Sequence, residues 1–301
     1  MKKVLIILNP CSGTRQANKH FADIIDIFCR SGYITEVATT GRSGDGTVIA
    51  TERTKGFDLV VCIGGDGTFN EVLAGVIASG EDVPIGYIPA GSTNDFANSL
   101  KLSKDILQAA RDIATGEPRT LDVGSFDGRL FSYVASFGAF TKASYEAPQS
   151  IKNALGHLAY ILEGIKDIPS IKSEQIWIKV GKEVYGGKYL FGAISNSTSV
   201  GGILTLDQSL VDMNDGKFEV LLIKSPSNIL ELNQILLALT TGNYNTPMIT
   251  FFSAEEFQIT ASPDMPWTLD GEYQEGSEEI VVKNLHSAMR LIVAKEKIVK
   301  G

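Results

Sequence analysis

The first 120 residues alternate short apolar runs with segments in which apolar residues recur at helical spacing. Short apolar runs bounded by turn residues are typical of strands that are buried on both faces. Strands are expected at residues 4–8, 34–40, 59–63 and 85–88. Helices are expected at residues 16–31, 44–54, 69–78 and 103–115, with Ser103 as the N-cap of the last and Gly32 and Gly116 as stop signals. This alternation predicts a parallel sheet that is covered by helices on both faces.

After residue 121 the pattern changes to alternation with a period of two, which is typical of half-buried strands. Phe126-Asp127-Gly128-Arg129 carries the Asp-Gly signal of a hairpin turn. Strands are expected at residues 175–180, 257–260, 279–282 and 289–293, and helices near residues 151–168 and 227–241. The fold class is thus α/β plus β: a parallel-sheet α/β domain over residues 1–124 and a β-rich sandwich over residues 125–287. No low-complexity linker separates the two, so we expect close contact and a cleft between them.

Composition favours a cytoplasmic protein. Of the 301 residues, 44% are hydrophobic, and no apolar stretch approaches the roughly 20 residues that span a bilayer. The apolar run at residues 4–8 is too short for a signal peptide. Cys11, Cys29 and Cys62 have neither paired nor metal-ligand spacing, which fits a reducing compartment.

The net charge of −8 argues against nucleic acid as a partner. Contact with an anionic membrane would need a local basic patch. One candidate is the segment 151–172, in which Lys152, Lys166 and Lys172 accompany apolar residues at helical spacing. The alternative is a helix that packs on the core and leaves its lysines in solvent. Peripheral attachment at the inner face of the membrane is an expectation that depends on such a patch.

Candidate chemistry begins at Gly64-Gly65-Asp66-Gly67-Thr68, which follows the apolar run 59–63. A strand, a glycine loop and a helix start direct backbone N–H groups toward an anion. The glycines remove Cβ atoms that would keep a phosphate away. An aspartate beside phosphate needs a metal ion or a proton to offset the repulsion, which suggests a Mg²⁺–nucleotide site. The segment lacks the P-loop pattern, and Asn70 stands where Gly-x-Gly-x-x-Gly needs its third glycine. The alternative is a simple tight turn.

Three further polar clusters stand at expected strand ends. They are Asn9-Pro10-Cys11-Ser12-Gly13, the run from Gly91 to Asp95, and Asp270-Gly271-Glu272. Ligands of open parallel α/β sheets collect beyond the carboxyl ends of the strands. We therefore expect these loops to converge on one crevice, with distant acidic side chains around a terminal phosphate.

With these motifs the chain resembles the bacterial diacylglycerol kinases and related lipid kinases, which share a catalytic module with sphingosine and ceramide kinases. The matching segments are Asn9-Pro10-x-Ser12-Gly13, Gly64-Gly65-Asp66-Gly67-Thr68-x-Asn70-Glu71, Gly91-Ser92-x-Asn94-Asp95-Phe96-Ala97 and Asp270-Gly271-Glu272. NAD kinases share the Gly-Gly-Asp-Gly-Thr core and the general fold, so that core leaves the acceptor open. The last two segments favour the lipid branch. The resemblance also implies that residues 288–301 return to the first domain.

The expected nucleotide is ATP, held at its phosphates by the glycine loops. The resemblance adds Thr40, and Ser92 keeps a hydroxyl where the family usually has threonine. The nucleotide-binding candidates are Asn9, Pro10, Cys11, Ser12, Gly13, Thr40, Gly64, Gly65, Asp66, Gly67, Thr68, Phe69, Asn70, Ser92 and Asn94.

Two magnesium sites are expected. Asp66, Asp95 and Asp122 come from separate loops, and carboxylates brought together repel unless a divalent cation or a shared proton joins them. Since Mg²⁺ prefers such oxygen ligands, we predict that they hold a catalytic Mg²⁺ largely through water. The alternative for Asp122 is a solvated turn. The resemblance implies a structural Mg²⁺ at Asp212, Asp215 and the carbonyl of Lys217, with an acidic turn as the alternative.

Asp270 and Glu272 flank Gly271, so in an extended segment their side chains point to the same side. Either carboxylate suits a general base toward a lipid hydroxyl; the resemblance assigns the role to Glu272, with Asp270 close by. The catalytic candidates are therefore Glu272, Asp270 and Asp66. His20, His157 and His286 share no metal or triad spacing and are interpreted as surface or packing residues.

Together these features predict an ATP- and Mg²⁺-dependent kinase that converts diacylglycerol to phosphatidic acid at a membrane surface. The alternatives are a kinase of NAD or of another lipid alcohol, such as phosphatidylglycerol or a sphingoid base. A nucleotide-binding regulator without catalysis is the non-enzyme alternative. Because relatives form dimers, a homodimer is a further expectation.

Overall fold

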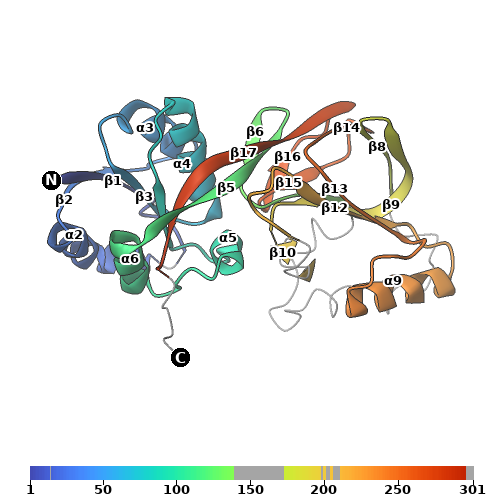
Figure 1. Cartoon of the computed structure of the whole chain (residues 1–301), viewed down its shortest axis with the longest axis horizontal. Helices are drawn as coiled ribbons and strands as arrows, with labels where there is room; N and C mark the ends of the chain where they lie inside the picture. The colour runs from blue at the N-terminus through green and yellow to red at the C-terminus, as the bar shows by residue number, and fades with distance from the viewer. Residues whose placement is uncertain (14, 139–172, 198, 201–203, 206–210, 296–301) are drawn as a thin grey trace. The chain divides into compact units, whose positions relative to one another are not determined.

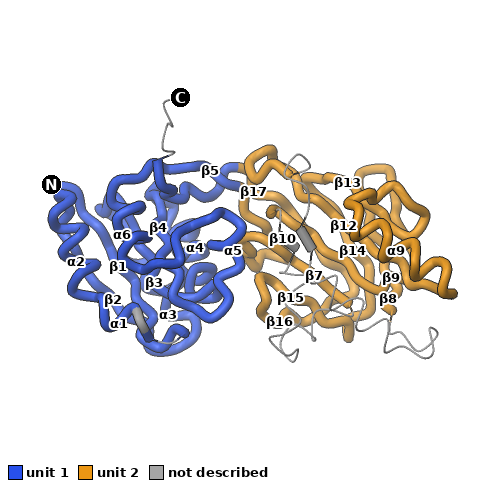
Figure 2. Tube along the Cα trace, turned by 90° about the horizontal axis from the view of Figure 1, so that it is seen from below, with its two compact units in different colours: residues 1–121, 287–301 blue, residues 122–286 orange. Residues whose placement is uncertain are grey.

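The computed structural model describes residues 1–13, 15–138, 173–197, 199–200, 204–205 and 211–295. The chain divides into two compact units, one of residues 1–121 and 287–301 and the other of residues 122–286 (Figure 2). The expected helix at 151–168, with Lys152, Lys166 and His157, and the nearby Lys172 lie outside the described residues.

Unit 1 is built on a parallel sheet. Its strands are β1 (Lys2–Leu8), β2 (Tyr33–Thr39), β3 (Leu59–Gly64) and β4 (Ile85–Pro89). Strand β1 lies between β2 and β3, and β3 pairs with β4, all in parallel. The final strand, β17 (Glu279–Val293), adds to this sheet where Leu291 pairs with Ile85. Both faces are buried along the apolar runs of β1, β3 and β4, whereas β2, at the edge of the sheet, is partly exposed. The parallel pairing confirms the expected α/β fold.

Helices cover both faces of this sheet (Figure 1). They are α1 (Gln16–Lys19), α2 (Phe21–Arg30), α3 (Asp45–Arg53), α4 (Asp66–Ser79), α5 (Asp95–Ser99) and α6 (Ile106–Thr115). On one face, α2 and α6 bury Ile24, Phe28 and Ile113 against Val4, Ile6 and Val61 of the sheet. On the opposite face, α3 packs against α4.

Three details of unit 1 differ from the sequence-based expectation. The helix expected at residues 16–31 is interrupted at His20, whose φ of −102° and ψ of 9° leave the helical region. Helix α4 starts at Asp66, three residues before the expected start, so only the second half of the glycine segment lies in its first turn. Ser103 is not the N-cap of α6: Asp105 takes that place because its carboxylate accepts the Gln108 N–H at 2.7 Å.

Unit 2 is rich in antiparallel strands, as expected. They are β6 (Arg129–Phe131), β7 (Val134–Gly138), β8 (Glu174–Val180), β9 (Glu183–Ser195), β10 (Ser199–Val200), β11 (Leu204–Thr205), β12 (Phe218–Lys224), β13 (Ile249–Ala254), β14 (Glu256–Ala261), β15 (Trp267–Leu269) and β16 (Glu272–Gln274). Strand β5 (Glu117–Phe126) and strand β17 each run through the boundary between the units. The segments 279–282 and 289–293, expected as separate strands, are both parts of β17.

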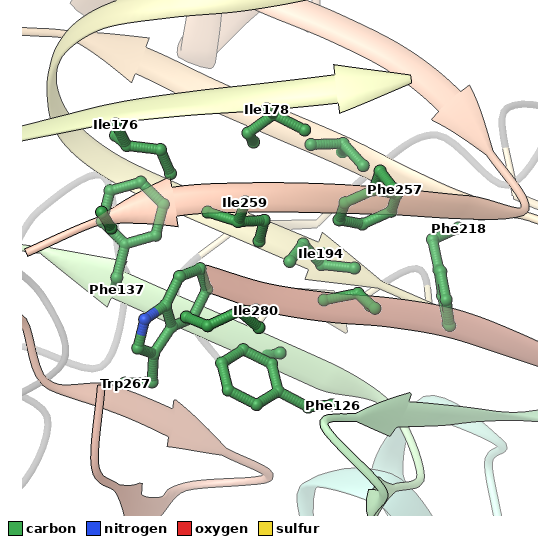
Figure 3. Close-up of a cluster of buried hydrophobic side chains, with 14 of the residues drawn as sticks. Phe126, Phe137, Ile176, Ile178, Ile194, Phe218, Phe257, Ile259, Trp267 and Ile280 are labelled. Carbon is green, nitrogen blue, oxygen red and sulfur yellow. The ribbon is translucent and has the colours of Figure 1, made fainter. Parts of the chain in front are cut away.

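The strands of unit 2 enclose one apolar core (Figure 3). Trp267 is fully buried in this core, and its ring centroid lies 4.9 Å from those of Phe126 and Phe137. These aromatic side chains come from β15, β5 and β7, so one cluster ties together segments that are far apart in the sequence.

Two local predictions for unit 2 are confirmed. The hairpin turn at Asp127-Gly128 joins β5 to β6, and both residues have the positive φ that a type I′ turn needs, 48° and 87°. The helix expected at residues 227–241 is α9 (Ile229–Thr241), capped by the side chain of Asn228. No helix among the residues described above is long and apolar enough to cross a membrane.

Gly75 of α4 lies at the contact between α3 and α4. A Cβ at this position would lie 2.4 Å from the Thr47 carbonyl oxygen and 2.6 Å from the Ala50 Cβ. We therefore expect Gly75→Ala to lower the free energy of unfolding by about 2 kcal/mol through overpacking, although alanine favours a helix by about 1 kcal/mol over glycine. Urea unfolding measures the change.

Ala78→Gly is the matched control, because Ala78 is exposed in the same helix. It should cost about 1 kcal/mol from helix propensity alone. A stabilised Gly75→Ala variant would show that propensity rather than interhelical contact governs this position.

Candidate active site

Three strand-end loops of unit 1 are joined by hydrogen bonds. The Asn9 N–H donates to the Ile63 carbonyl at 2.9 Å, and the Ala90 N–H donates to the Gly64 carbonyl at 2.7 Å. The Asn9 side-chain amide also donates to the Thr68 hydroxyl at 2.9 Å. The ends of β1, β3 and β4 therefore form one polar region, as expected for the carboxyl edge of a parallel sheet.

The glycines of these loops are required for packing between the loops themselves. A Cβ at Gly91 would lie 2.6 Å from the Gly65 Cα, and one at Gly13 would lie 2.4 Å from the Ala90 carbonyl oxygen. At Gly64 the Cβ would meet the Thr68 side chain at 2.6 Å. Glycine is thus needed at these positions because neighbouring protein atoms leave no space for a Cβ, whether or not a phosphate binds there.

Asp66 and Asp95 lie together at the start of two helices. The Asp95 N–H donates to Asp66 Oδ2 at 3.0 Å, so the first turn of α5 is hydrogen-bonded to the first residue of α4. The Tyr87 hydroxyl lies 3.4 Å from Asp66 Oδ1. Burial raises the pKa of Asp95 and, together with the charge of Asp66, raises the pKa of Tyr87 above its usual range. A cation beside these carboxylates would offset the cost of their desolvation.

Some nucleotide-binding candidates use their side chains within the protein. Phe69 is fully buried, and its ring centroid lies 4.6 Å from that of Tyr87 and 5.0 Å from that of Phe96. Asn94, with a φ of 53°, closes its own loop because its amide exchanges hydrogen bonds with the Gly91 N–H and carbonyl, both at 2.9 Å. The Phe69 N–H in turn donates to the Gly65 carbonyl at 3.0 Å, so this residue serves the core and the first turn of α4.

The other candidates surround these loops. Cys11 and Ser92 are exposed, and Pro10, Ser12 and Asn70 are half-buried. The Cys11 N–H donates to Asn9 Oδ1 at 3.0 Å, which orders the loop after β1. Thr40 is buried next to the same edge, where its N–H donates to the Leu8 carbonyl at 3.0 Å.

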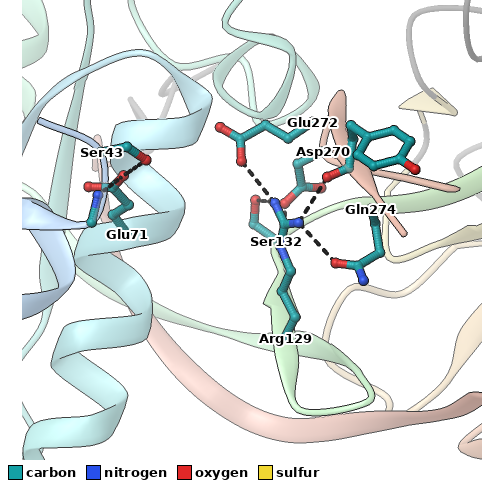
Figure 4. Close-up of polar contacts among 9 residues, drawn as sticks. Ser43, Glu71, Arg129, Ser132, Asp270, Glu272 and Gln274 are labelled. Carbon is teal, nitrogen blue, oxygen red and sulfur yellow. Dashed lines mark hydrogen bonds and ion pairs between the residues drawn. The ribbon is translucent and has the colours of Figure 1, made fainter. Parts of the chain in front are cut away.

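Glu71 of the same motif caps a neighbouring helix. Its carboxylate accepts the N–H groups of Gly44 at 2.7 Å and Gly46 at 3.0 Å and the hydroxyl of Ser43 at 3.3 Å (Figure 4). These groups belong to the start of α3, so Glu71 satisfies backbone donors that the helix itself leaves unpaired.

In unit 2, Asp270 is buried and its carboxylate is enclosed by donors. Oδ2 accepts the N–H and the hydroxyl of Ser132, the latter at 2.9 Å. Oδ1 accepts the N–H groups of Tyr133 at 3.0 Å and Val134 at 2.9 Å. Asp270 also has a φ of 49°. A carboxylate with donors on both oxygens is stabilised in its charged form and is an anchor for the turn.

Glu272 starts strand β16, and 54% of its side chain is exposed. Its Oε2 accepts a hydrogen bond from Arg129 Nη2 at 2.9 Å (Figure 4). Oε1 takes part in no hydrogen bond with the described part of the chain. Of the two carboxylates in the triplet, Glu272 is the one that solvent reaches. Arg129 is a site residue that the sequence analysis did not identify.

Asp122 is fully buried in β5, so the alternative of a solvated turn is wrong. Its Oδ2 accepts the Gly216 N–H at 2.7 Å, and its Oδ1 lies 2.9 Å from His286 Nδ1. The Asp122 N–H donates to the Met213 carbonyl at 2.9 Å. The acidic loop at residues 212–217 therefore packs directly on Asp122. His286 lies too far away in the sequence for spacing to have revealed this contact.

The acidic loop itself has regular turn bonds. Asp212 Oδ1 accepts the Asn214 N–H at 3.0 Å, Asp215 Oδ1 accepts the Lys217 N–H at 2.9 Å, and the Lys217 carbonyl accepts the Asn284 amide at 3.1 Å. Asp212 and Asp215 thus occupy one exposed turn, and the Lys217 carbonyl is engaged by a side chain.

Glu219 follows this turn in β12 and is 2% exposed, although its Oε2 has no hydrogen-bond partner among the residues that the structure describes. Burial and the nearby charge of Asp215 raise its pKa to about 8. A single charged residue inside the apolar run of residues 218–223 was the signal available in the sequence.

The structure places the acidic candidates in two groups. Asp66 and Asp95 belong to unit 1, whereas Asp122, Asp212, Asp215 and Glu272 belong to unit 2. Over the described ranges, no three His, Cys, Asp or Glu side chains form a group arranged to hold a metal ion. The three-loop magnesium site and the expected cleft therefore stay predictions.

Comparisons with known proteins give a consistent match. A family model described as "Diacylglycerol kinase catalytic domain" matches residues 3–126. Diacylglycerol kinase of Bacillus subtilis (strain 168) is 34% identical over 302 residues, which cover 99% of this chain and 98% of that protein. Diacylglycerol kinase of Staphylococcus saprophyticus is 30% identical over 274 residues, covering 90% and 89%. The crystal structure of a diacylglycerol kinase from Bacillus anthracis str. Sterne shares the fold, with a TM-score of 0.74, 19% identity and 97% coverage of each chain.

The anchoring of Asp270 leads to a stability prediction. Asp270→Asn keeps the shape but sets an NH₂ group against backbone N–H donors, so we expect the free energy of unfolding to fall by about 3 kcal/mol. Urea unfolding followed by circular dichroism measures it. Asp264→Asn, the same change at an exposed position of unit 2, should shift it by less than about 0.5 kcal/mol. Equal small effects in both variants would contradict the anchoring role.

Glu219 leads to a pH prediction. Its pKa is raised from 4.5 to about 8 in the folded protein, so the folded state keeps a proton that the unfolded chain releases. The free energy of unfolding should therefore decrease as pH rises between these two values. Glu219→Gln removes the titrating group and should be more stable than the natural protein by roughly 3 kcal/mol at pH 8, with little difference at pH 4.

Urea unfolding at both pH values, in the presence of a metal chelator, tests this expectation. Glu256→Gln is the control, because Glu256 is half-exposed in β14, another strand of unit 2. A stability difference for Glu219→Gln that does not change with pH would rule the expectation out.

Proposed function

Because the chain belongs to the diacylglycerol kinase family, it is a lipid kinase, and we propose that it transfers the γ-phosphate of ATP to the hydroxyl of diacylglycerol to form phosphatidic acid. The observation that carries this proposal is the family match over nearly the whole chain, joined to a solvent-accessible carboxylate, Glu272, on the motif that the lipid kinases share. The lipid substrate resides in a membrane, so the enzyme would work at its surface.

In this proposal the strand-end loops of unit 1 bind the nucleotide. The start of α4 at Asp66 leaves backbone N–H groups without helical partners, which suits phosphate oxygens. The joined loops after β1, β3 and β4 supply a rigid frame, since their glycines already pack against one another. Thr68 and Asn9, hydrogen-bonded to each other, keep the first two loops in register.

Magnesium fits the donors of unit 1. The Asp66 carboxylate accepts the Asp95 N–H, and burial raises the pKa of the Asp95 carboxyl, so a divalent cation would favour its charged form. Mg²⁺ bound through one or two carboxylates and several waters is usual in kinases, where it neutralises charge on the transferred phosphate. We propose Asp66 and Asp95 as its ligands; Asp122 is fully buried and both its carboxylate oxygens are engaged, so it is left out of this set. Asp212, Asp215 and the Lys217 carbonyl are proposed for the structural Mg²⁺.

Glu272 is the proposed general base and Asp270 its anchor. A base must reach the proton of the acceptor hydroxyl, and Glu272 has an exposed carboxylate of which one oxygen accepts no hydrogen bond from a described residue. Asp270 would have to give up backbone donors on either oxygen to serve in this way. The turn at residues 270–271 instead fixes the start of strand β16, and with it the position of Glu272.

Activity tests the proposal directly. Purified protein with Mg²⁺, ATP and mixed micelles of diacylglycerol should produce phosphatidic acid, measured with radiolabelled ATP. Asp66→Asn should lower kcat by at least about 10²-fold, since it removes a charge that holds the cation beside the phosphate. Asp26→Asn, at an exposed ion pair of α2, is the control and should leave kcat unchanged.

Other outcomes would redirect the proposal. Phosphorylation of NAD without any lipid product would indicate an NAD kinase. Phosphorylation of phosphatidylglycerol or a sphingoid base alone would keep the reaction and change the acceptor. Binding of ATP without turnover on any of these alcohols would indicate a regulator. The expected dimer and the peripheral membrane attachment stay predictions.

A further inference from the structure

We propose that Arg129 is the positioning residue that orients Glu272 for proton transfer, an inference that rests on the function proposed above. The two residues are separated by more than 140 positions in the chain, and both belong to unit 2. Their contact is therefore created by the tertiary fold of that unit.

The Arg129 guanidinium holds three successive residues of β16. Nη2 donates to Glu272 Oε2 at 2.9 Å, while Nη1 donates to the Tyr273 carbonyl at 3.0 Å and to Gln274 Oε1 at 2.9 Å (Figure 4). One planar group thus fixes the main chain of the strand and the carboxylate at its start. Because the donors of a guanidinium form a rigid fork, the carboxylate is held in direction as well as in distance.

Arg129 is itself held by a rigid hairpin. It pairs with Phe126 across the tight turn formed by Asp127 and Gly128. Asp127 pins that turn to β17, since its N–H donates to the Val281 carbonyl at 3.0 Å and its Oδ1 accepts the Val281 N–H at 2.7 Å. The guanidinium therefore extends from a fixed backbone, as precise positioning requires.

The two oxygens of Glu272 have different surroundings. Oε2 is occupied by Arg129, and Oε1 has no hydrogen bond to any described residue. A general base needs one oxygen turned toward the donor hydroxyl while the rest of the group stays still. The hydrogen bond from Arg129 to Oε2 holds the carboxylate in place and leaves Oε1 for the donor hydroxyl.

Surface ion pairs alone contribute little, about 0–1 kcal/mol. Lys283 and Glu256 form such a pair at 3.2 Å, with both side chains about half-exposed. The Arg129–Glu272 pair has similar exposure, 41% and 54%, but it also includes a main-chain carbonyl and a second side chain. Loss of Arg129 should therefore change the geometry of Glu272 more than the stability of the protein.

The test compares Arg129→Ala and Arg129→Lys in the diacylglycerol assay, with Lys283→Ala as the matched control for loss of an exposed cation. We expect Arg129→Ala to lower kcat by about 10²-fold and to leave KM for ATP within twofold. Arg129→Lys should recover part of this loss, because a lysine keeps the charge but not the fork. The control should keep the natural kcat.

A double-mutant cycle shows whether Arg129 acts through Glu272. In a Glu272→Gln background, Arg129→Ala should change kcat by less than twofold, since the group that it positions is gone. Multiplicative losses in the double variant would overturn the proposal, as would an Arg129→Ala variant with natural kcat. A large rise in KM for lipid or ATP at unchanged kcat would instead make Arg129 a direct substrate contact.

The failure of this proposal is distinguishable from failure of the proposed function. Absence of turnover by the natural protein on every lipid alcohol overturns both. Turnover that survives Glu272→Gln overturns the assignment of the base, and with it the role of Arg129. Turnover that is lost in Glu272→Gln but kept in Arg129→Ala overturns the role of Arg129 alone.

Discussion

The buried carboxylate of Asp270 is the constraint on which the candidate chemistry of unit 2 depends. A charge removed from water is stable only when donors replace the lost solvation. Here the backbone of residues 132–134 supplies most of those donors, and it can do so only if the hairpin β5–β6, strand β7 and the turn after β15 come together. The same requirement fixes the start of β16, and therefore the place of Glu272.

In unit 1, glycines allow the loops at the candidate site to pack together. Three strand ends must lie close enough to present one polar surface, and the backbone approaches at Gly13 and Gly91 leave no space for a Cβ. The loops are therefore packed closely against one another. An enzyme that transfers phosphate gains from such a frame, because most of its catalysis is positioning and charge stabilisation. The cost appears at Asp95, whose charge is disfavoured by burial.

Long, strongly patterned segments could be predicted from the sequence. The choice between two possible helix caps, or the exact point at which a helix is interrupted, could not. The apolar runs at β1 and β3, the hairpin at Asp127-Gly128 and helix α9 follow directly from periodicity and turn chemistry. Ser103 and Asp105 are both residue types that cap helices, and Asp105 is the N-cap of α6 because its carboxylate accepts the Gln108 N–H. The interruption at His20 leaves no mark on the apolar spacing of residues 16–31, so that spacing predicted one helix.

By itself the sequence determined the family, the α/β plus β class and the residue types at the candidate site, because motifs and periodicity are local properties that need no knowledge of distant neighbours. Only the tertiary structure decided the role open to each carboxylate. Asp270 and Glu272 look equivalent in the chain, and burial with backbone donors separates the anchor from the accessible group. The contacts of Arg129 and His286 are with residues far away in the sequence. The raised pKa of Glu219 comes mainly from burial. The spacing of residues along the chain shows neither kind of information.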